Sequence, residues 1–157
     1  MISKVTAQYD DVTLKPIRLK DLSHIAEIYT ENTVRSYAMS QTCSKLRAFL
    51  YTLRCLLTHS YHYAAFLDDT LIGIVDVKHK RNNCNRLGLL FKTAYLYVDS
   101  TVDNIVNIAC TTVCLYSKSP IVCSIPIKSK LNAALLSCGF KADSCANDNI
   151  AYVMKPA

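Results

Sequence analysis

Apolar residues follow two different periods in the first third of the chain. Residues 12–19 (VTLKPIRL) alternate as a half-buried strand does, although Pro16 favours an edge or a bulge. Asp21 can cap a helix over the next segment, DLSHIAEIYTEN, in which apolar residues recur at helical spacing. A second helix begins at Thr42 or Ser44 and carries an apolar stripe that we expect to face the core. The stripe consists of Leu46, Phe49, Leu50, Leu53 and Leu57.

Strand signals dominate the middle of the chain. Residues 62–80 (HYAAFLDDTLIGIVDVKHK) contain two apolar runs joined at Asp68–Asp69, which is typical of a hairpin. Residues 87–99 (LGLLFKTAYLYVD) predict a further strand, on which Tyr95 and Tyr97 share one face. Three antiparallel strands are therefore expected here.

The second half changes pattern. From Ser100 the apolar residues keep a helical face for about four turns. Residues 120–127 (PIVCSIPI) predict a strand buried on both faces, residues 129–140 a short helix that ends at Gly139, and residues 149–155 a closing strand. The whole order is β-α-α-β-β-β-α-β-α-β. It predicts an α+β, or mixed α/β, fold in which helices flank a central sheet.

Composition adds limits to this prediction. The 157 residues, 51% hydrophobic and without a linker-like segment, predict one domain over residues 1–157. No stretch is typical of a signal peptide or a membrane span, and the eight cysteines contain no CxxC pair, so we expect a cytoplasmic protein with buried free thiols and no metal site. The chain has a net charge of +6, and its basic residues are most concentrated at residues 78–86. This segment lacks interleaved aromatic residues, which favours a solvated turn over a nucleic-acid site. No membrane partner is expected.

Three stretches in this order resemble the GNAT superfamily of N-acetyltransferases. Residues 14–29 (LKPIRLKDLSHIAEIY) are similar to its first strand and helix, residues 63–77 (YAAFLDDTLIGIVDV) to its hairpin, and residues 131–143 (LNAALLSCGFKAD) to the helix that closes its acyl-CoA site. Residues 30–41 and Leu135, at a position where many members carry a tyrosine, resemble the ribosomal-protein alanine acetyltransferase branch. The resemblance implies a mostly antiparallel GNAT-like sheet, acetyl-CoA as cofactor, and an amine of a protein or small molecule as acceptor.

The chain departs from the family at the loop that holds the CoA pyrophosphate. Family members have an Arg/Gln-x-x-Gly-x-Gly/Ala motif there. When Val98 is placed on the family's strand-ending valine, Asp103 and Asn104 fall near the Arg/Gln position, and two β-branched residues (Val106 and Ile108) replace the glycines. Ser100 and Asp103 are also spaced as a capping box, which would satisfy the N–H groups of the helix itself. We therefore expect a degenerate cofactor loop.

The resemblance also indicates candidate site residues. Asp76 and Asp99 are placed to act as the base that takes the amine proton, and Tyr97 or Tyr95 as a hydroxyl donor. The alternative is that the aspartates are solvated or capping residues and the tyrosines build a sheet face. Residues expected near the cofactor are Tyr97, Val98, Asp103, Asn104 and Leu135.

Two functions of different class follow. The first is an N-acetyltransferase whose missing phosphate contact is rebuilt from basic residues such as Lys118, Lys128 or Lys130. The second is a GNAT-fold interaction or regulatory module that has lost acetyl-CoA binding. A third interpretation is an unrelated α+β domain, which parallel pairing of strands 87–99 and 120–127 along their whole length would favour. The apolar helices are compatible with a homodimer.

Overall fold

The computed structural model describes residues 6–9, 11–30, 45–57, 61–80, 83–95 and 99–156. Two 3-10 turns, η1 (Leu19–Asp21) and η2 (Thr93–Tyr95), accompany the helices α1 (Leu22–Thr30), α3 (Lys45–Leu57), α4 (Asp99–Tyr116) and α5 (Leu131–Ser137). The strands are β1 (Ala7–Tyr9), β2 (Val12–Pro16), β3 (Tyr61–Leu67), β4 (Thr70–Lys80), β5 (Cys84–Phe91), β6 (Ile121–Pro126), β7 (Lys141–Ala146) and β8 (Asn149–Met154). None of the helices in these ranges combines the length and apolarity that crossing a bilayer requires.

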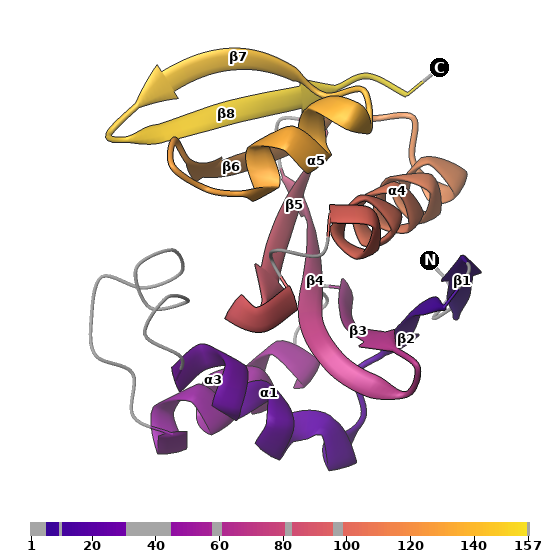
Figure 1. The fold of residues 1–157 in the computed structure, drawn as a ribbon, viewed down its shortest axis with the longest axis vertical. Helices are drawn as coiled ribbons and strands as arrows, with labels where there is room; N and C mark the ends of the chain where they lie inside the picture. Colours follow the sequence, from indigo (N-terminus) through magenta and orange to yellow (C-terminus); the bar gives the residue numbers. More distant parts are fainter. Residues whose placement is uncertain are drawn as a thin grey trace.

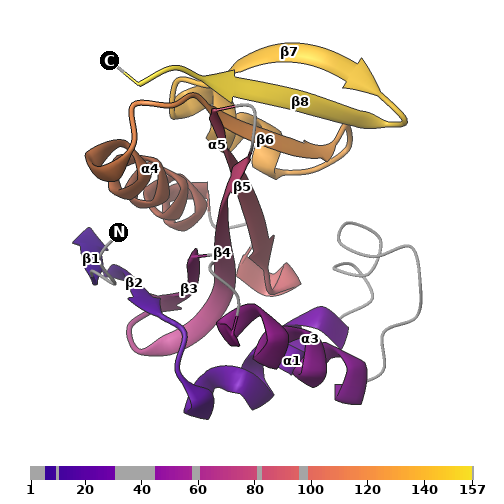
Figure 2. The same cartoon turned by 180° about the vertical axis from the view of Figure 1, so that it is seen from behind.

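The strands form one sheet in the order β1-β2-β3-β4-β5-β6-β8-β7, and every pair is antiparallel except β5–β6. Figures 1 and 2 show β4 and β5 running steeply through the molecule, whereas β6, β8 and β7 cross near one end. The α+β class and the mostly antiparallel sheet are as predicted. In the described part of the sheet Pro16 pairs with Tyr63 of β3, and the β1–β2 register runs from Ala7–Leu14 to Tyr9–Val12 without including Pro16.

Helices cover both faces of the sheet and divide the core in two. The larger core joins α4 and α5 to inward side chains such as Val75, Val77 and Leu87. The smaller core joins Ile25 and Ile28 of α1 to Ile74 on the opposite face of β4. Because neighbouring residues of a strand point to opposite faces, Asp76 and Lys78 share the α1 face with Ile74.

Two-residue turns close two of the hairpins of the sheet, β3–β4 and β7–β8. Asp68 and Asp69 join β3 to β4 with φ values of 45° and 64°, and Asn147 and Asp148 join β7 to β8 with φ values of 50° and 60°. Asp and Asn tolerate this left-handed backbone, which matches the twist of the strands. The first hairpin was predicted, whereas β7 and β1 were not.

The end of α5 is fixed by backbone hydrogen bonds. Gly139, at φ 87°, follows the C-cap residue Cys138; its N–H donates to Leu136 O, and the N–H of Phe140 donates to Leu135 O. These two bonds form a Schellman motif, which glycine accommodates without strain. The predicted ending of this helix is confirmed.

The apolar stripe of α3 does not face the core. Leu46, Leu50 and Leu57 are 68%, 53% and 78% exposed, and Phe49 is 37% exposed. α3 packs beside α1, so the amphipathic pattern predicted the helix correctly, but the expected contact of the stripe with the core is wrong for these four residues. Asp21 was predicted to cap the helix of residues 22–30. Instead, its Oδ2 accepts a hydrogen bond from the Arg18 N–H (2.9 Å) and so caps the N-terminus of η1.

Gly73→Ala is expected to lower the free energy of unfolding by about 1–3 kcal/mol, the usual range for overpacking. A Cβ at Gly73 would lie 2.3 Å from Phe91 Cδ1 and 2.7 Å from Leu90 O, so both a ring and a backbone atom must shift. Urea unfolding would measure the change. Ser124→Ala, at an exposed strand position, is the control and should stay within about 0.5 kcal/mol of the parent. Equal stability of the two variants would contradict the packing of Phe91 over Gly73.

Candidate active site at the parting of two strands

β5 and β6 pair over only part of their length. The parallel register joins Asn85, Arg86 and Leu87 to Ile121, Val122 and Cys123 and then stops, although β5 continues to Phe91 and β6 to Pro126. The two strands therefore part after Leu87, as Figures 1 and 2 show. Pairing along the whole length is excluded, and with it the observation that would have favoured an unrelated α+β domain.

A polar network holds the closed end of this opening. Asn85 is 1% exposed; its Nδ2 donates to Ser117 Oγ (2.9 Å), its N–H donates to Pro120 O (2.8 Å), and its Oδ1 lies 3.1 Å from His79 Nδ1. The amide thus ties β5 to β4 and to the segment between α4 and β6. Because its polar groups are satisfied, the buried Asn85 stabilises the point where the strands part.

The segment after β5 differs from the prediction. The strand ends at Phe91 rather than extending to Asp99, because η2 turns the chain at Thr93–Tyr95. Tyr95 therefore lies half-buried on this turn, against the larger core, and not on a strand face beside Tyr97. Tyr97 and Val98 lie outside the described residues. The predicted roles of Tyr97 and Val98 stay predictions.

The helix start also differs from the prediction. α4 begins at Asp99, so Ser100 is its second residue and Asp103 its fifth. The predicted Ser100–Asp103 capping box is wrong, because both residues lie inside the helix. Asp103 and Asn104 lie in the second turn, and Val106 is fully buried in the core. The predicted alignment of these residues with the pyrophosphate loop is therefore wrong, and the connection that reaches α4 contains residues 96–98.

Three residues form a row across the sheet beside the opening. The registers place His62 of β3 opposite Asp76 of β4, and Asp76 opposite Gly88 of β5. Alternation along each strand puts all three on the α1 face. Gly88 is the first residue of β5 beyond its pairing with β6. The row thus leads from a buried histidine through a carboxylate to the mouth of the opening.

Asp76 is held by two basic side chains. Its Oδ1 lies 2.7 Å from His62 Nδ1, and its Oδ2 lies 3.1 Å from Lys78 Nζ. Burial alone would raise the pKa of Asp76, but the hydrogen bond and charge of His62, together with Lys78, outweigh it and lower the pKa below its usual value. Asp76 is therefore ionised at neutral pH, with a partner on each oxygen.

Gly88 leaves room for the Asp76 carboxylate at the mouth of the opening between β5 and β6. A Cβ at this position would come within 3.2 Å of Asp76 Cβ and 3.7 Å of Asp76 Oδ2. The absence of a side chain leaves this face of β5 open next to the carboxylate. A larger residue would separate Asp76 from the backbone that lines the opening.

His62 was missed as a site residue. The sequence analysis gave His62 no role in the site, whereas in β3 only 6% of its side chain is exposed and its Nδ1 contacts Asp76. Its Nε2 has no hydrogen-bond partner among the residues that the structure describes. The sequence did indicate this strand position, because His62 alternates with Ala64 and Phe66 along one face of the run HYAAFL.

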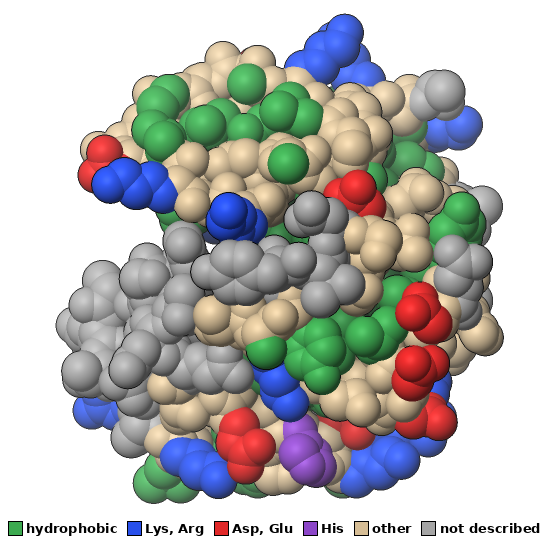
Figure 3. Space-filling view, viewed as in Figure 1, with side chains coloured by type: hydrophobic (Ala, Val, Ile, Leu, Met, Phe, Trp, Pro, Cys, Tyr) green, Lys and Arg blue, Asp and Glu red, His purple; other side chains and the backbone are tan. Residues whose placement is uncertain are grey.

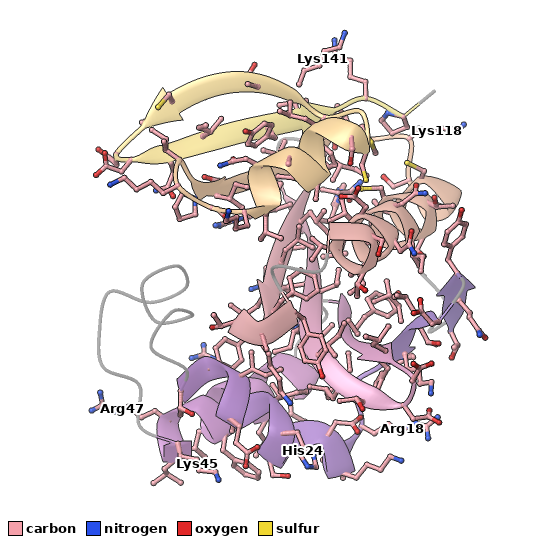
Figure 4. The ribbon with its side chains drawn as sticks, viewed as in Figure 1. Arg18, His24, Lys45, Arg47, Lys118 and Lys141 are labelled. Atoms are coloured by element: carbon pink, nitrogen blue, oxygen red, sulfur yellow. The ribbon has the colours of Figure 1, made fainter. Side chains whose placement is uncertain are left out.

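The remaining predicted residues lie outside the three strands of this row. Leu135 is fully buried in the larger core. Asp99 is the first residue of α4. Lys118 follows the C-terminal end of α4 and points outward in Figure 4, about 27 Å along an 18-residue helix from its N-terminus, so it is not placed to replace the phosphate loop. Lys128 and Lys130 are exposed near the start of α5.

Three of the described cysteines, Cys110, Cys123 and Cys138, are unsuited to act as nucleophiles. Burial raises the pKa of Cys123 to about 12 and also raises the pKa of Cys110 and Cys138. Six of the cysteines in the described ranges are free thiols, namely Cys84, Cys110, Cys114, Cys123, Cys138 and Cys145, and Cys145 is exposed rather than buried as expected.

Basic residues do not form a single patch on the face drawn in Figure 3, where Lys and Arg side chains are scattered among other types. A nucleic-acid surface normally concentrates such residues on one face or stripe. This face therefore offers no support for a nucleic-acid partner.

Comparison with solved structures identifies the fold. No family profile and no curated protein matches the sequence. A GNAT-family acetyltransferase from Bacillus anthracis superposes with a TM-score of 0.81 at 10% identity, covering 97% of this chain and 99% of that one. Spermidine N-acetyltransferase from Vibrio cholerae, in complex with CoA and spermine, gives 0.79 at 14% identity over 94% and 97%. The ribosomal L7/L12 acetyltransferase RimL, in complex with coenzyme A, gives 0.79 at 10% identity over 94% and 95%.

These similarities show that the chain has the GNAT acetyltransferase fold, which confirms the fold that the sequence resemblance implied. Structures of a polyamine acetyltransferase and of a ribosomal-protein acetyltransferase match equally well. At 10–14% identity they carry no information about the acceptor of this chain.

Asp76→Asn is expected to lower the free energy of unfolding at pH 7 by about 1–3 kcal/mol, the range for hydrogen bonds to charged groups. Because the folded-state pKa of Asp76 is lowered, this stabilisation is present above the ordinary value of 3.8 and is lost as the pH falls below it. Urea unfolding of both chains at pH 7, 5, 4 and 3 should show the difference shrinking below pH ~4. Asp143→Asn, on the exposed strand β7, is the control. A difference that stays constant with pH would contradict the paired state of Asp76.

Proposed function

We propose that this chain is an N-acetyltransferase that transfers the acetyl group of acetyl-CoA to an amine. The observation that carries the proposal is the parting of β5 from β6 after Leu87, with the Asp76 carboxylate beside its start. Neighbouring folds whose descriptions name CoA support the choice of donor.

The open edges of the two strands fit an extended acyl-CoA arm. Backbone N–H and C=O groups of Gly88–Phe91 on the β6 side have no strand partner in the described sheet. The four residues of β5 beyond its pairing with β6 span about 13 Å. This length would let the arm run from the N-terminal side of α4 to the closed end of the opening at Leu87. Phosphate groups would lie toward the N-terminus of α4, whose free N–H groups and dipole attract anions. Acetyl-CoA supplies the thioester, and the arm would place it near Leu87 and Gly88.

Asp76 would hold the acceptor amine. Its lowered pKa makes it a weak base but a permanent anion, suited to binding and orienting an ammonium group before that group loses its proton to water. A free N–H of β5 would stabilise the negative charge that develops on the carbonyl oxygen. His62, behind Asp76, fixes the carboxylate.

A second candidate is a GNAT-fold binding or regulatory module without acetyl-CoA. The segment KTAYLYVD, residues 92–99, contains no glycine, and Asp99 places a negative charge in the first turn of α4. Both features weaken a phosphate site at this helix.

Calorimetry with acetyl-CoA on reduced protein, at low and moderate salt, tests the choice between the two. We expect micromolar binding. Asp99→Asn should tighten it about two- to fivefold, because a negative charge in the first turn opposes the phosphates by about 0.3–1 kcal/mol. Asp103→Asn is the matched control, since its second-turn position lies beyond the range of this effect.

Absence of binding by the parent and by both variants would reject the acetyltransferase and favour the binding module. An equal gain in the two variants would show that net charge, and not the helix terminus, governs the affinity.

A further inference from the structure

The ammonium group of Lys78 already lies where an acceptor amine would bind. Its Nζ is 3.1 Å from Asp76 Oδ2, the oxygen that faces Gly88. Lys78 itself is opposite Arg86, where β5 and β6 are still paired. The side chain therefore carries its Nζ from the closed end of the opening toward the level of Gly88, where the strands have parted.

The Lys78 amine is accessible to solvent, and the Asp76 carboxylate that it contacts is held in place. The Lys78 side chain is 41% exposed, so it can move and can exchange protons with water, whereas its partner Asp76 is 26% exposed and held from behind by the buried His62. A primary amine held against a fixed carboxylate has the local concentration and orientation that acyl transfer needs.

We propose that Lys78 is an internal acceptor and that the chain acetylates itself at Lys78 Nζ when no other amine is present. The inference rests on the proposed function, because acetyl-CoA is the donor. It assigns a modification site and gives the acceptor site its chemistry: an unbranched primary amine on an aliphatic chain.

The step balances without any further reactant. Lys78 Nζ loses one proton to water and becomes a neutral amine. Its lone pair forms a bond to the thioester carbonyl carbon, the carbon–sulfur bond breaks, and the electron pair leaves on the CoA sulfur. The nitrogen gives up a second proton, which the thiolate takes, so that the products are Nε-acetyl-lysine, CoA thiol and one released proton.

Another lysine provides an internal reference. Lys141 begins β7, which is separated from β5 by β6 and β8 in the sheet order. It is exposed, and Figure 4 shows it pointing away from the body of the molecule. Non-enzymatic acetylation would modify Lys141 at least as readily as the partly buried Lys78.

The experiment incubates the reduced chain with acetyl-CoA in the absence of an amine and quantifies acetyl groups on Lys78 and Lys141 by peptide mass spectrometry. We expect at least tenfold higher occupancy at Lys78, suppressed by excess CoA. With acetyl phosphate, a donor that needs no CoA site, the preference for Lys78 should disappear. The modified fraction at a given time should not change over a tenfold range of protein concentration, because the transfer is intramolecular.

Asp76→Asn should reduce acetylation at Lys78 and leave Lys141 unchanged. Circular dichroism would show whether this variant is folded, and competition by CoA tests the same site without any substitution.

Three results would overturn the inference: equal occupancy of the two lysines, persistence of the Lys78 signal in excess CoA, or a fraction that rises with protein concentration. If calorimetry shows acetyl-CoA binding while Lys78 stays unmodified, only this inference fails. If no acetyl-CoA binds, the proposed function fails with it.

Discussion

The parallel contact between β5 and β6 is only three residues long, and the arrangement of the molecule depends on where it stops. Up to Leu87 the two strands share a ladder that the buried Asn85 fixes from the side. Beyond Leu87, among the strands that the structure describes, β5 stays paired only with β4, and β6 only with β8. The sheet is therefore built as two antiparallel halves joined at one short segment. In the part of the sheet that the structure describes, backbone polar groups without a strand partner line the gap between the halves, whereas buried backbone groups in proteins are normally paired.

A charged group lies beside this gap, and its surroundings explain how it is tolerated. Burial disfavours the ionised form of Asp76, and a buried carboxylate without partners would be costly. His62 and Lys78 supply one contact to each oxygen, and Gly88 leaves room for the carboxylate next to β5. The cluster is thus organised around keeping a negative charge at the mouth of the gap. That property suits the binding of cations better than the removal of protons.

Sequence reasoning succeeded where local signals decide the structure and failed where distant contacts do. The turns at Asp68–Asp69 and Gly139 follow from residue type, and the alternating and helical periods located most elements. The continuation of the strand through Tyr95 was wrong because the chain turns after Phe91 into η2, where the N–H of Tyr95 donates to Lys92 O (3.0 Å). Residues 92–95 contain no Gly or Pro that would mark this turn in the sequence. The start of α4 shifted with it, which moved Asp103 away from the helix terminus.

The candidate site likewise contains one residue that the sequence analysis identified and contacts that only the fold creates. Asp76 was a candidate because the family resemblance placed it as a base, but its partners could not be paired with it from sequence alone. His62 is 14 positions away in the chain and meets Asp76 only through the register of β3 on β4. The face of an amphipathic helix is equally a tertiary property, which is why the pattern of α3 predicted a helix without showing which side would be covered.

The exposed side of α3 has a consequence for the behaviour of the protein in concentrated solution. Leu46, Phe49, Leu50 and Leu57 present a row of apolar side chains to water, while a net charge of +6 makes copies of the chain repel one another. Added salt shortens the range of that repulsion to about 8–10 Å at 0.10–0.15 M, and sulfate strengthens the attraction between apolar surfaces. The colloidal stability of the chain therefore rests on its charge, so that salts of this kind should act on it as precipitants earlier than on a protein whose helices hide their apolar rows.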